Sequence, residues 1–263
     1  MKYIDYLNKI LEAIEKAEVF DYPFPHMVLE VPYDTLDMKG HETNYMARMS
    51  GREIYSFVLL KDEMLDSKIE EIGNLIEKKL NIDKPIVYNE NNFLKKTQYS
   101  EIWNDGSELD IQEIHLDYLI KNNMIYDGVN CKSIQVNDKT QTVYSMHIYI
   151  PSDDNHIELG TSIYSEPTAD ELKSKLKKSI GSDDYMKYIS HKADYPIELF
   201  TMIKKQYNSF MKKEKTIPYK PGVIFIHNTT LKSWHSAPSV PEGYIRKSIM
   251  TRWDYTIVEP ELA

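Results

Sequence analysis

The chain has 263 residues, of which 41% are hydrophobic and 28% charged, and its formal net charge is −9 at pH 7. This composition is typical of a globular domain with a sizeable core, and the negative charge argues against a general nucleic-acid-binding surface. The single cysteine, Cys131, excludes an internal disulfide and a cysteine-based zinc site, and because we find neither a long apolar run nor a signal-peptide pattern we expect a cytoplasmic protein without a membrane span.

Two amphipathic helices and at least one strand are predicted in the first third of the chain. Apolar residues recur at helical spacing over 2–18 and again over 63–80, where Asp62 is the predicted N-cap. A strand is predicted over 26–31, and the apolar run 55–60 is compatible with either element. Helices of this kind are expected to pack on the outside of a sheet and to support it.

Strands dominate the prediction for the rest of the chain. The pattern over 84–150 predicts strands separated by loops at 89–92, 104–107 and 137–140. Farther on, 223–226 is β-branched and aromatic and follows the Pro-Gly turn that typically precedes a strand.

Three residues have the identity and spacing of an iron site. His115 and Asp117 are two residues apart, so on a strand their side chains share one face. Two imidazoles and one carboxylate on one side of a metal form the facial triad of non-heme Fe(II) oxygenases, which leaves the opposite side open. His235 is the candidate for the second imidazole and would come from a later strand. A His-x-Asp triplet alone is common by chance, so its weight depends on the segments that follow it.

A basic side chain and a hydroxyl follow His235 on one face of a predicted strand. The alternation of residues over 244–250 places Arg246 and Ser248 together. A planar guanidinium binds a carboxylate through two parallel hydrogen bonds, and a neighbouring hydroxyl adds a third. The pair therefore suits one carboxylate of a dicarboxylic acid such as 2-oxoglutarate. His227, on the strand that leads to His235, is expected to pack inside the fold.

In this order the segments resemble the 2-oxoglutarate-dependent Fe(II) oxygenase superfamily, especially its prolyl-hydroxylase-like branch. The resemblance covers roughly residues 100–255, and its blocks are 114–117, 146–151, 159–164, 221–226, 234–236 and 245–249. The offset from His235 to Arg246 is 246 − 235 = 11 residues, the spacing usual in that family. Leu159-Gly160 stands where the family has a double glycine, and Ile150-Pro151 where it has Leu-Asn, but neither position supplies a metal ligand.

The resemblance implies a mainly β, α+β fold of the double-stranded β-helix type, a cupin-like jelly roll. One domain would span 1–263, with N-terminal helices and supporting strands over 1–83 and the jelly-roll core over 84–258. The connection over 165–216 is longer than is usual in the family. Helical pieces are predicted there at 168–179 and 196–211, the first opening with the capping-box pattern of Thr168 and Glu171. The sequence leaves a lid, a homodimer contact and a surface elaboration open as its role.

The resemblance also implies a ligand set. Fe(II) would be held by His115, Asp117 and His235, with 2-oxoglutarate and O2 as co-substrates. Arg246 and Ser248 would hold the distal carboxylate of 2-oxoglutarate.

Tyr149 corresponds in position to a family tyrosine whose hydroxyl contacts 2-oxoglutarate, and packing inside the barrel is the alternative for it. The expected reaction is hydroxylation of an unactivated C–H bond, with succinate and CO2 as co-products. Asp117 argues against halogenation, because related halogenases carry a small residue in its place.

Several alternatives stay open at this point. Desaturation, ring closure and epimerisation use the same ligands as hydroxylation. The substrate is expected to be a small molecule or an amino-acid side chain, free or peptidyl, with no nucleic-acid or membrane partner. A cupin-like ligand-binding protein would not need Arg246 and Ser248 in register with His235. A metal-dependent hydrolase or isomerase would use a redox-silent metal, and neither of these two rivals would form succinate.

Overall fold

The computed structural model describes residues 1–37, 42–50, 53–82, 88–104, 114, 124–126, 131–133, 140–153, 155–168, 171, 209–230, 232–238 and 240–257. The elements in chain order are α1 (Tyr3–Lys16), β1 (His26–Glu30), β2 (Glu42–Ser50), β3 (Glu53–Lys61), α2 (Glu63–Leu80), β4 (Tyr88–Asn104), β5 (Met124–Tyr126), β6 (Cys131–Ser133), β7 (Thr140–Tyr149), the 3-10 helix η1 (Ile157–Leu159), β8 (Ser162–Ser165), β9 (Lys212–Thr216), β10 (Val223–Asn228), β11 (His235–Ser236) and β12 (Ile245–Ile257).

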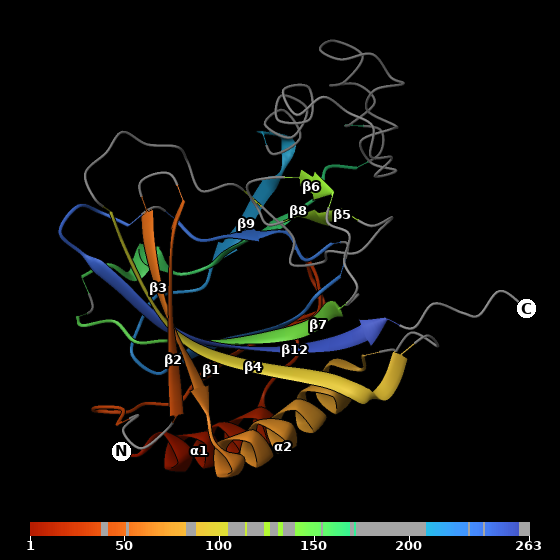
Figure 1. The fold of residues 1–263 in the computed structure, drawn as a ribbon. Helices are drawn as coiled ribbons and strands as arrows, with labels where there is room; N and C mark the ends of the chain where they lie inside the picture. The colour runs from red at the N-terminus through yellow and green to blue at the C-terminus, as the bar shows by residue number, and fades with distance from the viewer. Residues whose placement is uncertain are drawn as a thin grey trace, which may run out of the picture.

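Two antiparallel sheets form the body of the fold. The large sheet has the strand order β1-β10-β7-β12-β4-β3-β2, and the small sheet has the order β11-β8-β9 (Figure 1). From β7 onward the chain passes from the large sheet to β8 and β9, returns to β10, crosses to β11 and returns to β12. Winding back and forth between two antiparallel sheets is the jelly-roll pattern. The expected mainly β, α+β jelly-roll fold is therefore confirmed.

The two helices cover the outer face of the large sheet, as the sequence predicts (Figure 1). Alternate residues of β12 divide between the two faces: Ile249 and Trp253 are buried in the core cluster that includes residues of both helices. At Gly73 the helix α2 lies so near the sheet that an added Cβ would collide with the indole nitrogen of Trp253. Arg246 and Ser248 belong to the opposite face of β12, which looks into the space between the sheets.

The long helix α2 begins and ends where the sequence predicts. The carboxylate of Asp62 accepts a hydrogen bond from the backbone N–H of Leu65 at 2.7 Å, as an N-cap does. The helix ends at Asn81, whose φ of 48° lies in the left-handed region. Helix α1 covers most of the predicted range 2–18.

One predicted loop is wrong, and several other local predictions fall outside the residues that the structure describes. β4 runs from Tyr88 to Asn104 without a break, so the loop predicted at 89–92 is wrong. Asparagine is disfavoured in strands, and the register with β12 shifts here: Phe93 pairs with Tyr255 and Tyr88 with Ile257, so β4 passes through 89–92 as an irregularity between two paired positions. Of the loops predicted at 104–107 and 137–140, Asn104 is the last residue of β4 and Thr140 the first of β7. The other residues of these loops, and most of both helical pieces, lie outside the described residues.

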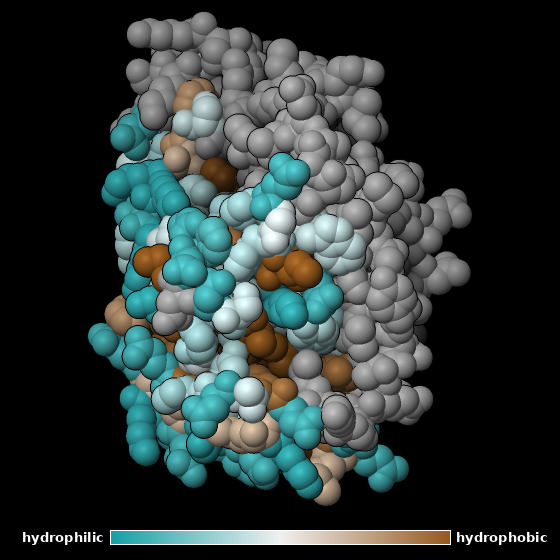
Figure 2. Space-filling view, turned by 90° about the vertical axis from the view of Figure 1, so that its left-hand side faces the viewer, coloured by the Kyte–Doolittle hydropathy of each residue, from teal (hydrophilic) through white to brown (hydrophobic). Residues whose placement is uncertain are grey.

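Where the described residues form the face on the left of Figure 1, it is largely hydrophilic, with hydrophobic residues showing in its middle (Figure 2). Among the described side chains, Ile157 and Ile245 are two of the exposed large hydrophobic residues, at 44% and 42% exposure. No helix in the described ranges is long and apolar enough to cross a membrane.

Candidate functional site

The space between the two sheets is lined by buried side chains from both. A second apolar cluster joins residues of the large sheet to residues of the small sheet and its connections. Its buried members are Phe24, Tyr149, Leu159, Ile163, Ile217, Tyr219, Val223 and Phe225. Polar side chains within this space are therefore shielded from water and must find partners in the protein or in a ligand.

Arg246 is such a side chain, only 6% exposed. Its Nε donates a hydrogen bond to the carbonyl oxygen of Leu159 at 2.8 Å. Its guanidinium carbon lies 5.7 Å from the ring centroid of Tyr149 and 5.6 Å from that of Tyr219. Among the residues that the structure describes, no carboxylate pairs with this guanidinium, and the bond to Leu159 is its only hydrogen bond. A buried cation without a counter-charge is costly, so the surroundings of Arg246 favour an anionic ligand.

Ser248 lies two residues farther along the same face of β12 and is 5% exposed. Its hydroxyl oxygen is 3.0 Å from that of Ser100 on β4, and either oxygen can be the donor. On the other side, Ser248 and Tyr149 are paired across β12 and β7. The structure thus brings Arg246, Ser248 and Tyr149 together at one end of the space between the sheets.

The hydroxyl of Tyr149 is already engaged by a residue of the small-sheet side. It donates to the Thr161 hydroxyl at 2.7 Å and accepts from the Thr161 N–H at 3.0 Å. Burial raises the pKa of Tyr149, against the opposing effects of Arg246 and of the bonds to Thr161. The sequence left the Tyr149 hydroxyl either to 2-oxoglutarate or to packing inside the barrel, and in this structure its proton goes to Thr161. The Thr161 hydroxyl, which accepts that proton, has its own to donate.

Tyr219 completes the aromatic surroundings of Arg246. Its hydroxyl donates to the Lys247 carbonyl at 2.9 Å and accepts from the Lys247 N–H at 2.6 Å, which fixes the ring. Burial raises the pKa of Tyr219 too, so both phenols beside Arg246 remain neutral. Sequence reasoning missed Tyr219 and Thr161, and nothing in the pattern distinguishes Tyr219 from the other tyrosines among the 20 in the chain.

His235, the candidate metal ligand on β11, is 4% exposed and pairs with Ile163 in the small sheet. Its Nδ1 lies 2.8 Å from the Ser233 carbonyl oxygen. Because a carbonyl only accepts, Nδ1 carries the proton, and the lone pair of the neutral ring is on Nε2. Histidines that bind metals commonly donate the other ring N–H in this way.

The other two candidate ligands, His115 and Asp117, lie outside the described residues. Within the described part of the chain, no three histidine, cysteine, aspartate or glutamate side chains gather into a metal-binding group. Of the triad inferred from the sequence, His235 is therefore the member that the structure describes.

His227 lies beside His235 and is fully buried, as expected for a residue packed inside the fold. Their ring centroids are 5.0 Å apart. The Nε2 of His227 is 2.7 Å from the hydroxyl of Ser145, which is also 3.2 Å from Nε2 of His147. Nδ1 of His227 is 3.3 Å from the Asn228 carbonyl, so it donates there and Nε2 accepts from Ser145. Ser145 in turn accepts from His147, which gives the chain of hydrogen bonds a single direction.

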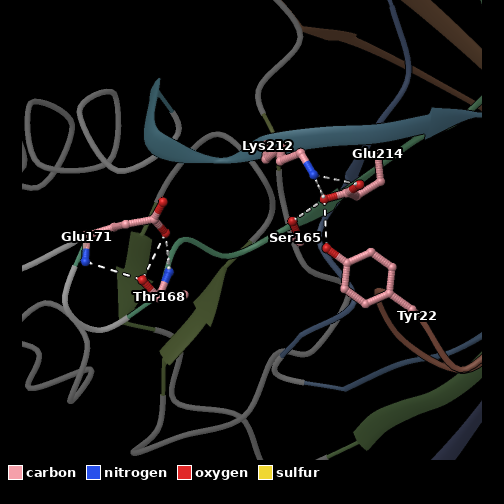
Figure 3. A network of polar contacts seen from close by, with 6 residues as sticks. All are labelled: Tyr22, Ser165, Thr168, Glu171, Lys212 and Glu214. Carbon is pink, nitrogen blue, oxygen red and sulfur yellow. Dashed lines mark hydrogen bonds and ion pairs between the residues drawn. The ribbon is translucent and has the colours of Figure 1, made fainter.

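A polar network ties β9 to β8 and to the segment before β1 (Figure 3). The carboxylate of Glu214 accepts from the hydroxyls of Ser165 at 2.6 Å and Tyr22 at 2.8 Å. Lys212 donates to the same carboxylate at 3.2 Å. These three hydrogen bonds lower the pKa of Glu214 to about 2.

The predicted capping box lies just beyond β8 (Figure 3). The Glu171 carboxylate accepts from the backbone N–H and the hydroxyl of Thr168 at 2.8 and 2.9 Å, and the Glu171 N–H reaches the Thr168 hydroxyl at 3.3 Å. This reciprocal pairing is the capping-box arrangement, so the prediction for these two residues is confirmed.

Comparisons with known proteins give similarity at the level of overall structure. No protein-family model matches the chain, and no curated protein sequence matches it. Among solved structures, the non-heme α-ketoglutarate-dependent epimerase SnoN from nogalamycin biosynthesis is 12% identical, with 95% of this chain and 82% of that chain covered and a TM-score of 0.41. The corresponding carbocyclase SnoK is 11% identical, with coverages of 85% and 73% and a TM-score of 0.40. A Pseudomonas putida prolyl-4-hydroxylase is 9% identical, with coverages of 82% and 79% and a TM-score of 0.35. Similarity at this level does not assign an activity to the chain, whose chemistry has to be inferred from its own residues.

Proposed function

We propose that residues 1–263 form one catalytic domain, an Fe(II)- and 2-oxoglutarate-dependent dioxygenase. It would hydroxylate an unactivated C–H bond of a small molecule or an amino-acid side chain. The observation that carries the proposal is the burial of Arg246 and the lack of a carboxylate partner for it in the described part of the chain. Arg246 shares a strand face with Ser248. It also follows the candidate metal ligand His235 at the offset expected from the sequence.

The surroundings of Arg246 suit one end of a dicarboxylic acid. The bond from Nε to the Leu159 carbonyl orients the guanidinium and leaves its terminal N–H groups to donate in parallel to a carboxylate. The rings of Tyr149 and Tyr219 lie near the guanidinium and exclude water from it. Low local polarity strengthens each hydrogen bond that the carboxylate would receive.

Hydroxyls beside Arg246 would complete this carboxylate site. We assign Ser248 a direct hydrogen bond to the distal carboxylate. We keep Tyr149 in the 2-oxoglutarate site, where its ring lies beside the guanidinium and its hydroxyl orients Thr161. Because burial keeps both phenols beside Arg246 protonated, neither competes with the ligand as an anion.

We propose that His115, Asp117 and His235 hold the iron. His235 fits this role because its Nδ1 proton is committed to Ser233, which leaves Nε2 as the donor atom, and because it is buried. Two nitrogens and one carboxylate oxygen suit Fe(II) and leave coordination positions open. When bound, the iron would couple the oxidative decarboxylation of 2-oxoglutarate to succinate and CO2 with hydroxylation of the substrate C–H bond, with O2 as the oxidant that supplies one oxygen atom to each product.

Succinate formation tests the proposal directly. The protein is supplied with Fe(II), 2-oxoglutarate and air, and succinate is measured without and with candidate substrates. We expect slow succinate release from the wild type, none from His235→Ala, and unchanged release from Lys247→Gln, which removes a charge from the opposite face of β12. If the wild type binds iron but yields no succinate under any of these conditions, a cupin-like binding protein or a redox-silent hydrolase or isomerase becomes the better interpretation.

A further inference from the structure

A second arginine lies on the inner face of β12. Arg252 comes six residues after Arg246, an even number, so the two side chains leave the strand on the same face. The Nε of Arg252 is buried and has no hydrogen-bond partner among the described residues. Buried guanidinium N–H groups without an acceptor are costly. The Nε of Arg252 thus lacks an acceptor among the described residues, whereas the Nε of Arg246 donates to the Leu159 carbonyl oxygen.

The register of the large sheet places Arg252 at the end where His235 lies. Arg252 is paired with Ser145 across β12 and β7. The hydroxyl of Ser145 bonds to His227, and the ring of His227 lies beside that of His235. Arg252 thus lies beside Ser145 in the sheet, at the level of the two histidines that include the candidate metal ligand. A substrate must present its reacting C–H bond in this part of the barrel.

The Arg246 pocket lies at the other end of the same strand. Six residues of extended strand separate the Cα atoms of the two arginines by about 20 Å. Arg246 is surrounded by Tyr149, Tyr219 and the Leu159 carbonyl, whereas Arg252 is level with Ser145. The two guanidinium groups therefore serve different parts of the space between the sheets.

A second buried polar group without a partner lies at the His235 end. The hydroxyl of Thr229 has no hydrogen-bond partner among the described residues, and the residue is 4% exposed. Its backbone N–H donates to the Val143 carbonyl at 2.7 Å, so Thr229 borders β7 two residues from Ser145. Arg252 borders β7 from the other side, on β12. Two donors without acceptors at one end of the barrel indicate a site for an acceptor-rich group.

We propose that Arg252 is a specificity-determining residue that binds an anionic group, a carboxylate or a phosphate, of the oxidised substrate. A guanidinium recognises both groups through parallel hydrogen bonds. The inference rests on the proposed function and narrows its substrate class to anionic molecules. The Thr229 hydroxyl would supply a further hydrogen bond to the same group or to a neighbouring part of the substrate.

Calorimetric titration tests this assignment without turnover. The protein is loaded with Mn(II) and saturated with 2-oxoglutarate, so that the Arg246 pocket is filled, and is then titrated with inorganic phosphate or acetate as probes. We expect the wild type and Lys247→Gln to bind at least one probe equally well. Arg252→Gln should weaken that binding roughly tenfold or more, and Arg252→Lys should recover part of it. Far-UV circular dichroism checks that the variants are folded. If Arg252→Gln does not fold, Arg252→Lys still tests the assignment.

Each other outcome is decisive. If the wild type binds neither probe, or if Arg252→Gln binds them as the wild type does, the assignment of Arg252 is overturned. If Arg252→Gln instead weakens 2-oxoglutarate, Arg252 belongs to the oxo-acid site, and the assignment is overturned as well. Failure of the wild type to bind 2-oxoglutarate in the loading step refutes the proposed function, and the probe titrations, repeated without it, still decide whether Arg252 binds anions.

Discussion

Replacement of Arg246 by methionine separates a ligand-binding arginine from a structural one. Methionine keeps much of the side-chain length and removes the charge and the donors. The loss of the hydrogen bond from Nε leaves the Leu159 carbonyl without that donor, at a cost of about 1–3 kcal/mol. Removing a buried cation that has no counter-charge in the described part of the chain acts in the opposite direction. We therefore expect the free energy of unfolding without ligand to change by no more than about 2 kcal/mol.

The affinity for 2-oxoglutarate should change far more than the stability. Two parallel charge-assisted hydrogen bonds in a buried site contribute roughly 2–4 kcal/mol to binding. At about 1.4 kcal/mol for each factor of ten, the Kd for 2-oxoglutarate should rise about 30- to 1,000-fold in Arg246→Met. Lys247→Met is the matched control, because Lys247 is a basic residue of the same strand whose side chain pairs with Glu101 on the neighbouring strand β4.

Two measurements decide between the roles of Arg246. Urea unfolding gives the stability of each variant, and calorimetry with Mn(II) gives the Kd for 2-oxoglutarate. If Arg246→Met leaves this Kd unchanged and lowers the free energy of unfolding by about 3–5 kcal/mol, the loss expected when a buried ion pair is broken, then Arg246 is structural. The carboxylate site would then have to be abandoned.

Three further predictions concern other parts of the molecule. His235→Ala should lose most of its bound Fe(II), as measured by metal analysis after anaerobic loading, while retention of one iron per chain would remove His235 from the ligand set. Gly160→Ala should lower the free energy of unfolding by more than about 2 kcal/mol in urea, because its Cβ would collide with the Ile217 carbonyl; an unchanged midpoint would contradict this packing. The pKa of Glu214 is lowered from 4.5 to about 2, so its ionised network stabilises the fold above pH 4.5 and the contribution is lost as the pH falls toward 2. The difference in Tm between the wild type and Glu214→Gln should accordingly disappear over that pH range, and a difference that does not vary with pH would refute the role of the charge.

The elements that the sequence predicted well are those with a clear period or a local signal. Helix α2 has both an apolar stripe and an N-cap at Asp62, and its bounds match the prediction. The face that Arg246 and Ser248 share follows from simple alternation on β12. Local signals of this kind are independent of the rest of the fold.

Other features depend on partners that are distant in sequence, and the sequence pattern did not reveal these features. β4 continues through an asparagine-rich stretch because it pairs with β12 on both sides of that stretch, at Phe93 and at Tyr88. The long strand β2 depends on pairing with β3. Tyr219 lies beside Arg246 with its hydroxyl fixed by the Lys247 backbone, and Thr161 matters because Tyr149 lies against it. Such pairings follow from the tertiary fold and leave no local pattern.

The most direct test of the central claim is a visible spectrum recorded without oxygen. Fe(II) is added to the protein, followed by 2-oxoglutarate, and the Arg246→Met and His235→Ala variants are treated in parallel. The account predicts a weak metal-to-ligand charge-transfer band in the wild type, no band in His235→Ala, and a band in Arg246→Met only at much higher 2-oxoglutarate concentration. A wild type that binds iron but develops no band would contradict the account and make Arg246 a structural residue.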